Sequence, residues 1–188
     1  MIKIGITGSL SSGKTTASKI LSKNRGPLFS ADKAVKEIYK NRIFRSLITK
    51  KFLIQNKNQI KKNLKKIVLN DRKNLKRLEK IIHPLVRKKM SRFNFKNKNK
   101  KILFFEIPLL IESKLMKHFN VIIFIKSKKK VRLKRFIKNK GNKKLFNFLN
   151  SQQLPDKRKI KFCDHIVVNE KNLKILKKNL LNIISKYV

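Results

Sequence analysis

The sequence predicts an α/β fold in which a five-stranded parallel sheet is flanked by helices. Short apolar runs alternate with longer segments of helical periodicity, which is typical of parallel α/β sheets. A glycine-containing turn also joins the first apolar run to the first helical segment. The clearest runs, Ile102–Glu106 and Val121–Ile125, are nearly continuous in β-branched and aromatic residues, as strands buried on both faces should be.

The remaining elements follow from the same patterns. Lys3–Ile6 is expected to form the first strand, Pro27–Ser30 a weak second strand and His165–Val168 the fifth. Leu173–Ile184 has apolar residues at helical spacing and predicts a closing amphipathic helix. No strand of comparable quality is indicated between residues 33 and 95, where helical spacing is set by Leu64, Ile67, Val68, Leu75, Leu78, Ile81 and Ile82.

These elements predict a single domain of 188 residues with two additions to its sheet. Residues 33–100 would form a helical insertion that ends in a solvated connector over residues 94–101. The basic segment 128–150 would form a helical lid. The core would then comprise residues 1–32, 101–127 and 151–188.

Composition limits the class of protein. With 40% hydrophobic residues the chain can bury a core, and its single cysteine, Cys163, excludes a disulfide framework or a multi-cysteine zinc site. Because no apolar run approaches the length of a membrane span, we expect no membrane association and a cytoplasmic location.

The net charge is extreme, with 52 Lys+Arg against 9 Asp+Glu and a formal value of +43. One interpretation is a nucleic-acid binder, because basic surfaces attract phosphate backbones without sequence specificity. The other is compositional drift, since lysine is spread over nearly every segment together with many Asn, Ile and Phe, all of which have A/T-rich codons. A dedicated binding surface would be clustered, so we favour drift and expect no specific nucleic-acid partner.

Residues 8–15, GSLSSGKT, match the phosphate-loop pattern G-x-x-x-x-G-K-[ST] between a predicted strand and a predicted helix. Gly8 and Gly13 allow backbone angles that turn N–H groups toward phosphates, and the following helix adds its positive dipole end. Lys14 would reach the β- and γ-phosphates of ATP, and the Thr15 hydroxyl would bind Mg²⁺. The expected ATP-binding set also includes Ser11, Ser12 and Thr16.

The loop by itself leaves motors, GTPases and kinases open. GTPases generally need an Asn-Lys-x-Asp motif, and the pair Asn139-Lys140 is followed by Asn142 where that Asp should stand. Motor-type ATPases usually need a longer core with an apolar run that ends in Asp or Asp-Glu. A small chain with a helical insertion and a basic segment after the fourth strand fits the nucleoside-monophosphate-kinase-like class better.

Further short motifs lie in order along nearly the whole chain. They are Ile6–Thr16 (ITGSLSSGKTT), Ser30–Asp32 (SAD), Leu78–Pro84 (LEKIIHP), Ile107–Ser113 (IPLLIES), Val131–Arg135 (VRLKR), and Gln153, Asp164 and Asn169. Taken together they closely resemble the dephospho-CoA kinase family. The resemblance implies transfer of the ATP γ-phosphate, with Mg²⁺, to the ribose 3′-hydroxyl of dephospho-CoA, which gives coenzyme A.

The resemblance, combined with position, assigns the catalytic residues. Asp32 follows the second strand and would therefore lie at the carboxyl edge of the sheet, where it could act as base toward the acceptor hydroxyl. The alternative, which we favour less, is a helix N-cap before AVKEIY. Lys14 and Arg135, which matches the first lid arginine of the family, complete the expected catalytic set.

The resemblance also implies an acceptor-binding set of Asp32, Lys61, His83, Pro108, Leu109 and Glu112. Each of the charged members has an ordinary alternative. His83, before Pro84 at the end of an apolar helical run, could be a packing residue. Lys61 could belong to a solvated face, and Glu112 could be a surface helix residue or could order the loop that faces the substrate.

Two positions depart from the family pattern. Ser30 stands where the family has the first Asp of D-A-D, and Asn139 stands where it has a second lid arginine. Lys138 or Lys140 could substitute for that arginine, although lysine lacks the bidentate fork. Asn169 matches a position near the adenine in the family, although asparagine after a strand is also an ordinary turn residue.

Two alternatives to dephospho-CoA kinase remain at this point. One is another small-molecule or nucleotide kinase of the same fold. The other is a basic RNA-binding protein with a vestigial phosphate loop, against which the intact Lys14 and Thr15 argue. We expect a monomer or a weak homo-oligomer.

Overall fold

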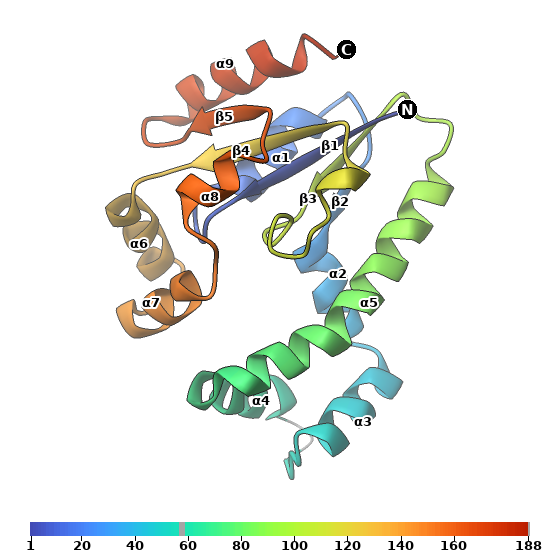
Figure 1. Ribbon diagram of the computed structural model, residues 1–188, viewed down its shortest axis with the longest axis vertical. Helices are drawn as coiled ribbons and strands as arrows, with labels where there is room; N and C mark the ends of the chain where they lie inside the picture. Colours follow the sequence, from blue (N-terminus) through green and yellow to red (C-terminus); the bar gives the residue numbers. More distant parts are fainter. Residues whose placement is uncertain (57–58, 188) are drawn as a thin grey trace. The chain divides into compact units, whose positions relative to one another are not determined.

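A computed structural model describes residues 1–56 and 59–187 of the chain. Its centre is an all-parallel sheet of five strands in the order β2-β3-β1-β4-β5 (Figure 1). This confirms the predicted fold class. The strands are β1 (Ile2–Gly8), β2 (Leu28–Ser30), β3 (Ile102–Glu106), β4 (Val121–Lys126) and β5 (His165–Val168).

β1 lies in the middle of the sheet, and its last five residues are all buried. It pairs with β3 on one edge, with Ile6 opposite Glu106, and with β4 on the other, with Gly8 opposite Ile125. β2 and β5 extend the sheet outward from β3 and β4. Because all strands are parallel, their carboxyl ends lie at one edge, which is where ligands bind in open α/β sheets.

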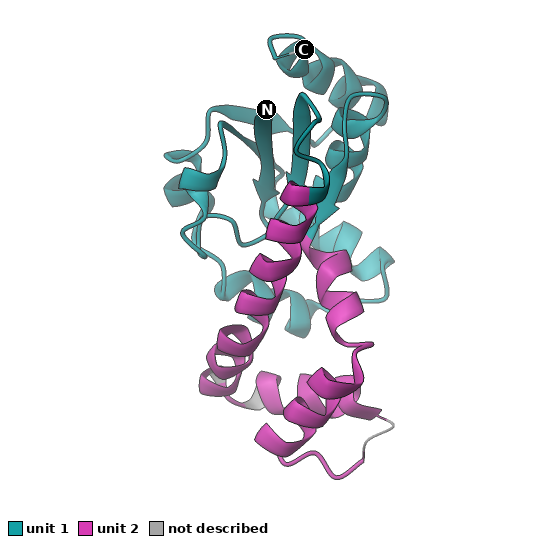
Figure 2. Ribbon diagram, turned by 90° about the vertical axis from the view of Figure 1, so that its right-hand side faces the viewer, with its two compact units in different colours: residues 1–30, 96–188 teal, residues 31–95 magenta. Residues whose placement is uncertain are grey.

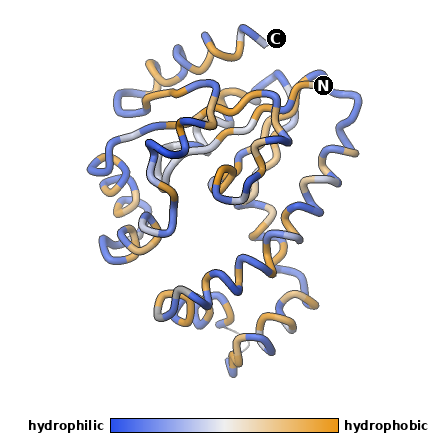
Figure 3. Tube along the Cα trace, viewed as in Figure 1, coloured by the Kyte–Doolittle hydropathy of each residue, from blue (hydrophilic) through white to orange (hydrophobic). Residues whose placement is uncertain are grey.

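One face of the sheet is covered by helices α1 (Lys14–Ser22) and α9 (Leu173–Ile184). Leu176, Leu180 and Ile184 of α9 pack with Ala17 and Leu21 of α1 against strand side chains. Figure 3 shows the apolar residues recurring along α9 with the spacing that this burial requires. The predicted closing helix is therefore confirmed.

The opposite face is covered in part by the long connection between β3 and β4, which contains a short helix, η2 (Met116–His118). Phe119 packs edge-on against Phe105, with ring centroids 5.3 Å apart. Gly5 leaves room for this connection, because a Cβ there would lie 2.7 Å from Leu110 Cδ1.

Residues 31–95 form a separate compact unit, shown in magenta in Figure 2, and residues 1–30 with 96–188 form the sheet unit. The magenta unit is all helical, as the sequence predicts for this stretch. It has its own apolar core, to which Phe44, Ile48, Leu64 and Ile82 contribute. Its helices are α2 (Ala31–Ile38), α3 (Arg42–Lys51), α4 (Ile60–Asn70) and α5 (Arg72–Lys96). α5 ends at Lys96, where the second segment of the sheet unit begins.

α5 corrects two sequence-based expectations. His83 lies inside this helix, not at its end, and Pro84 is accommodated in the interior. A proline there costs about 3 kcal/mol, but Ile82 is buried and Leu85 and Val86 pack on the core of the unit, so burial outweighs the lost hydrogen bond. The helix also continues to Lys96 through part of the expected connector.

The remaining helices belong to the sheet unit. α6 (Lys129–Lys138) and α7 (Lys143–Ser151) occupy the segment expected to be a lid, and α8 (Asp156–Ile160) precedes β5. α6 ends because Asn139 is its C-cap and Lys140 has a φ of +61°. Asn142 then caps α7 by accepting from Leu145 N at 2.8 Å.

Among the residues that the structure describes, no helix is both long enough and apolar enough to cross a membrane.

The helical unit offers a matched test of its core. We expect Ile48→Ala, at a fully buried position of α3, to lower the free energy of unfolding by about 2–5 kcal/mol, because it removes apolar contacts and leaves a cavity. Ile43→Ala, on the same helix and 80% exposed, should change it by less than about 0.5 kcal/mol. Urea denaturation followed by circular dichroism measures both values, and equal effects would contradict the assigned core.

Candidate active site

The phosphate-loop motif forms the connection between β1 and α1, at the carboxyl edge of the sheet. Gly8 has a φ of +148°, and a Cβ there would lie 2.4 Å from Ile125 O. Gly13 has a φ of +96°, and a Cβ there would lie 2.2 Å from Asn169 Nδ2. Both positions therefore require glycine for conformational and steric reasons.

Helix α1 begins directly at the end of the loop, without a side-chain cap. Gly13 is the N-cap of α1, makes no side-chain cap, and no acidic residue lies in the first turn. The first N–H groups of a helix have no intrahelical acceptor and carry the positive end of the dipole, so this terminus suits an anion. Thr15 and Thr16 lie exposed in this first turn.

The Lys14 side chain turns back toward the beginning of the phosphate loop. Its side chain is largely buried, and its Nζ donates a hydrogen bond to Ser9 O at 2.8 Å. The ammonium group is thus held within the span of the loop, where it can meet phosphate oxygens.

Three groups surround the carbonyl oxygen of Ser12. Asn169 Nδ2 donates to it at 2.8 Å, Arg135 Nη1 donates at 3.4 Å, and Ser127 Oγ lies 3.3 Å away. In a trans peptide the C=O and the next N–H point in opposite directions. Holding the Ser12 carbonyl outward therefore turns the Gly13 N–H toward the interior of the loop.

These contacts show where three predicted site residues lie. Arg135 of α6 and Asn169 after β5 both contact the loop backbone, and Ser127 links them by accepting from Arg135 at 3.2 Å and donating to Asn169 O at 2.6 Å. Ser12 Oγ is buried and has no hydrogen-bond partner among the described residues. The structure thus brings Arg135 and Asn169 together with the loop, while their roles toward ATP stay predictions.

Arg132 is a site residue that the sequence reasoning missed, although it lies within the matched motif. Its Nη1 donates to Leu10 O at 3.3 Å and to Asn150 Oδ1 at 2.7 Å, and its Nε donates to Ser127 O at 3.1 Å. Burial lowers the pKa of this guanidinium, and the nearby carboxylate of Asp156 opposes that shift. Arg132 therefore holds the backbone of the phosphate loop at Leu10.

Glu106 is a second missed residue. It ends β3, is almost fully buried, and its Oε1 accepts a hydrogen bond from the Thr15 hydroxyl. A carboxylate at the end of a buried strand beside the loop strand is the feature that could have predicted it. No cluster of three or more His, Cys, Asp or Glu side chains that could hold a metal occurs in the described part of the chain. The hard oxygens of Thr15 and Glu106 nonetheless suit Mg²⁺, which keeps several waters and needs few protein ligands.

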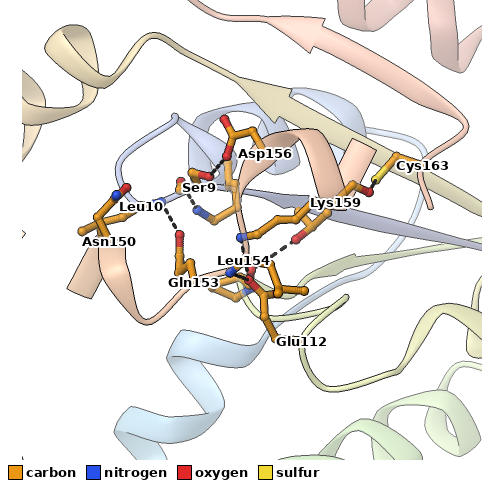
Figure 4. A network of polar contacts seen from close by, with 12 residues as sticks. Ser9, Leu10, Glu112, Asn150, Gln153, Leu154, Asp156, Lys159 and Cys163 are labelled. Atoms are coloured by element: carbon orange, nitrogen blue, oxygen red, sulfur yellow. Dashed lines mark hydrogen bonds and ion pairs between the residues drawn. The ribbon is translucent and has the colours of Figure 1, made fainter. Parts of the chain in front are cut away.

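The segment before β5 also contacts the loop (Figure 4). Gln153 Oε1 accepts from Leu10 N at 2.9 Å, and Asp156 Oδ1 accepts from the Ser9 hydroxyl. Nearby, Cys163 donates to Lys159 O at 3.3 Å. Burial, assisted by Asp164, raises the pKa of the Cys163 thiol to about 12.

The residues after β3 form turns against the sheet unit. The Thr7 hydroxyl donates to Pro108 O at 3.2 Å, and Leu109 is half-buried. Glu112 forms an ion pair with the buried Lys159, at 2.6 Å between Oε1 and Nζ. Their contacts with an acceptor stay predictions.

Three predicted residues lie in the helical unit. Asp32 is the second residue of α2 and is exposed in its first turn, where a carboxylate is favourable to the helix dipole. Lys61 lies over the Tyr39 ring, 5.5 Å from its centroid. It lines a cavity of about 540 Å³ with Tyr39, Lys40, Arg45, Gln59, Ile60 and Lys62.

His83 is half-buried within α5. Burial lowers the pKa of its imidazole; Glu79 opposes this shift and Arg87 adds to it. The side chain is therefore mostly neutral at neutral pH, which suits hydrogen bonding better than charge pairing.

The central strand, the glycine loop that leaves it and the helix that begins at Lys14 place the chain among the P-loop kinases. These are small α/β proteins that transfer the terminal phosphate of a nucleotide.

Comparison with known proteins specifies the family. The family model for dephospho-CoA kinase matches residues 2–174. A dephospho-CoA kinase from Bartonella quintana is 35% identical over 186 residues, which cover 96% of this chain and 95% of the relative. The chain belongs to the dephospho-CoA kinase family, whose members are ATP-dependent kinases with a hydroxyl acceptor.

Solved structures agree. A dephospho-CoA kinase from Campylobacter jejuni superposes with a TM-score of 0.64 at 26% identity, covering 98% of this chain and 96% of that one. The protein TT1252 from Thermus thermophilus superposes with a TM-score of 0.81 at 23% identity, covering 100% and 98%, which supports the fold.

The hydrogen bond between Asn169 and the Ser12 carbonyl can be tested directly. We expect Asn169→Ala to weaken ATP binding about tenfold, because losing the shortest of the three contacts frees the peptide that turns the Gly13 N–H inward. Asn147→Ala, at an exposed position of α7, is the control and should leave ATP affinity unchanged. Isothermal titration calorimetry with ATP measures both, and wild-type affinity in Asn169→Ala would contradict this role.

Proposed function

We propose that this protein phosphorylates the ribose 3′-hydroxyl of dephospho-CoA with ATP and produces coenzyme A and ADP. The observation that carries the proposal is the family match over residues 2–174, in a chain whose phosphate loop contains Gly8, Gly13, Lys14 and Thr15. Similarity of fold alone would support the proposal less strongly, because P-loop proteins catalyse many different reactions.

ATP would bind with its phosphates against the inward N–H groups of the loop and the N-terminus of α1. In the reaction the acceptor oxygen attacks the γ-phosphorus, the bond from that phosphorus to the β–γ bridging oxygen breaks, and ADP leaves. Negative charge spreads over the γ-phosphate oxygens during transfer. Lys14 and Arg135, both near the loop backbone, would stabilise that charge.

Contacts for the rest of the nucleotide come from the loop and from the strand ends. We assign phosphate contacts to Ser11, Ser12 and Thr16, and we assign Asn169 to the adenine side of the site. Mg²⁺ would be held by Thr15 with the Glu106 carboxylate behind it, and when bound it would neutralise charge between the β- and γ-phosphates.

Asp32 would accept the proton of the acceptor hydroxyl. Support comes from its place in the family motif and from the chain itself. β2 ends at Ser30, so Asp32 follows the carboxyl end of this strand by two residues. A carboxylate at this point can orient a hydroxyl and remove its proton as the new P–O bond forms.

We assign acceptor binding to Lys61, His83, Pro108, Leu109 and Glu112, together with Asp32. Lys61 is supported by the basic lining of its cavity, which also contains Lys40, Arg45 and Lys62 and would attract an anionic acceptor. The neutral imidazole of His83 would donate or accept a hydrogen bond. Asn139 leaves α6 without the second lid arginine, so Lys138 or Lys140 would supply that charge.

The formal charge of +43 supports no second function, because lysine occurs in nearly every element. We propose a cytoplasmic protein that acts as a monomer or a weak homo-oligomer and has no specific nucleic-acid partner. An RNA retention assay at physiological salt checks the last point, since electrostatic binding without structure falls steeply as salt rises.

The function is tested by coupled measurement of ADP release from ATP and Mg²⁺ on addition of dephospho-CoA, with coenzyme A identified as the product. AMP, CMP and shikimate are the control acceptors and should give only background turnover. If a folded preparation that binds ATP forms no coenzyme A, the proposal is wrong. Turnover of one of the control acceptors would indicate another kinase of the same fold.

Asp32→Asn isolates the proposed base. We expect its kcat to fall at least about 100-fold, because an amide cannot accept the proton, while ATP affinity stays within about twofold of wild type. Asp71→Asn is the matched control in the same helical unit, since an asparagine there can still cap the backbone N–H of Lys73. Near-normal turnover of Asp32→Asn would remove it from this role.

A further inference from the structure

Residues 153–159 make two sets of polar contacts that face different partners. On one side Gln153 and Asp156 hold the backbone N–H of Leu10 and the hydroxyl of Ser9, the second and third residues of the phosphate loop. On the other side the same segment is anchored to a single side chain, Glu112 (Figure 4).

Glu112 fixes the segment at two points. Its Oε1 accepts from Leu154 N at 3.2 Å and pairs with Lys159 Nζ at 2.6 Å. These two points lie on either side of Asp156 along the chain, and one of them adjoins Gln153. The anchor therefore determines where both loop contacts can be placed.

Burying the ion pair between Glu112 and Lys159 costs desolvation free energy, which argues against a role in stability alone. The Lys159 side chain is fully buried and that of Glu112 is 15% exposed. Although the ion-pair distance is short, Lys159 Nζ and Glu112 Oε2 lack a hydrogen bond of good geometry within the described residues. Desolvating such a pair costs about as much as its attraction returns, so apolar side chains would stabilise the fold equally well.

We propose that Glu112 and Lys159 are positioning residues for ATP binding, which act through Asp156 and Gln153 to fix Ser9 and Leu10 of the phosphate loop. When Ser9 and Leu10 are fixed, the N–H groups that face the interior of the loop are ordered before phosphate binds. The entropy cost of ordering them is then not subtracted from the binding free energy of ATP. The inference depends on the ATP-binding part of the proposed function and not on the identity of the acceptor.

The test is the affinity for ATP measured by calorimetry without acceptor, at about 0.15 M ionic strength to screen the general positive charge. We expect Lys159→Met and Glu112→Gln each to weaken ATP binding about tenfold. In steady-state assays Lys159→Met should raise the KM for ATP and leave the KM for dephospho-CoA unchanged. Failure of turnover with dephospho-CoA would affect the proposed function but not this binding result.

Lys157→Met is the matched control, because it removes a lysine from an exposed position of the same helix. It should leave ATP affinity within about twofold of wild type, since surface charges contribute little at this ionic strength. An effect equal to that of Lys159→Met would mean that net charge alone is responsible, and would overturn the proposal.

A double-mutant cycle tests the route of the effect. Asp156→Ala should weaken ATP binding by itself, and Lys159→Met should add little in that background, because both changes release the same contact. Fully additive effects would overturn the assignment. So would single variants that lower the melting temperature but retain wild-type ATP affinity, because that result describes a purely structural pair.

If the single variants fold poorly, Glu112→Leu combined with Lys159→Met removes both charges and leaves none buried without a partner. This variant lacks the acceptor for Leu154 N, so we still expect weakened ATP binding. Wild-type affinity here would overturn the proposal. Gln153→Ala and Asp156→Ala, which leave the ion pair intact, must also reproduce the loss for the proposal to stand.

Discussion

The outward orientation of the Ser12 carbonyl is the constraint on which the rest of the site depends. Asn169, Arg135 and Ser127 approach this one oxygen from the segments that follow β5 and β4. Since a peptide plane is rigid, fixing one carbonyl fixes the direction of the next N–H. The sheet brings these donors together because its parallel strands all end at one edge. The fold therefore shapes the loop from outside, and the loop then presents its inner surface to phosphate.

Local sequence patterns predicted the elements and the loop well, for a clear physical reason. A strand such as Ile102–Glu106 is buried on both faces, so its composition alone reveals it, and the glycines of the loop are required by backbone angles that few other residues adopt. What could not be predicted are contacts between distant segments. Glu106 meets Thr15 across 91 positions and Arg132 meets Leu10 across 122, and neither distance leaves a local pattern. The interior position of Pro84 was missed because burial of its neighbours outweighed a local preference.

The scarcity of carboxylates makes their placement informative. Of 9 acidic residues, several take part in polar contacts that organise the sheet unit, although 52 basic side chains surround them. Glu106, Glu112 and Asp156 lie around the phosphate loop, and Asp164 accepts from Ile122 N at 2.7 Å where β4 begins. Because basic side chains far outnumber acidic ones, few carboxylates are available for each potential donor. Those of the sheet unit accept from hydroxyl and backbone N–H groups or pair with the buried Lys159.

The environment of Cys163 determines how readily its thiol takes part in disulfide exchange. Disulfide exchange proceeds through the thiolate, and a thiol whose pKa is about 12 is almost entirely protonated at neutral pH. Its sulfur is also half-buried and engaged with a backbone carbonyl. The single cysteine of this chain is therefore a poor nucleophile toward a disulfide partner.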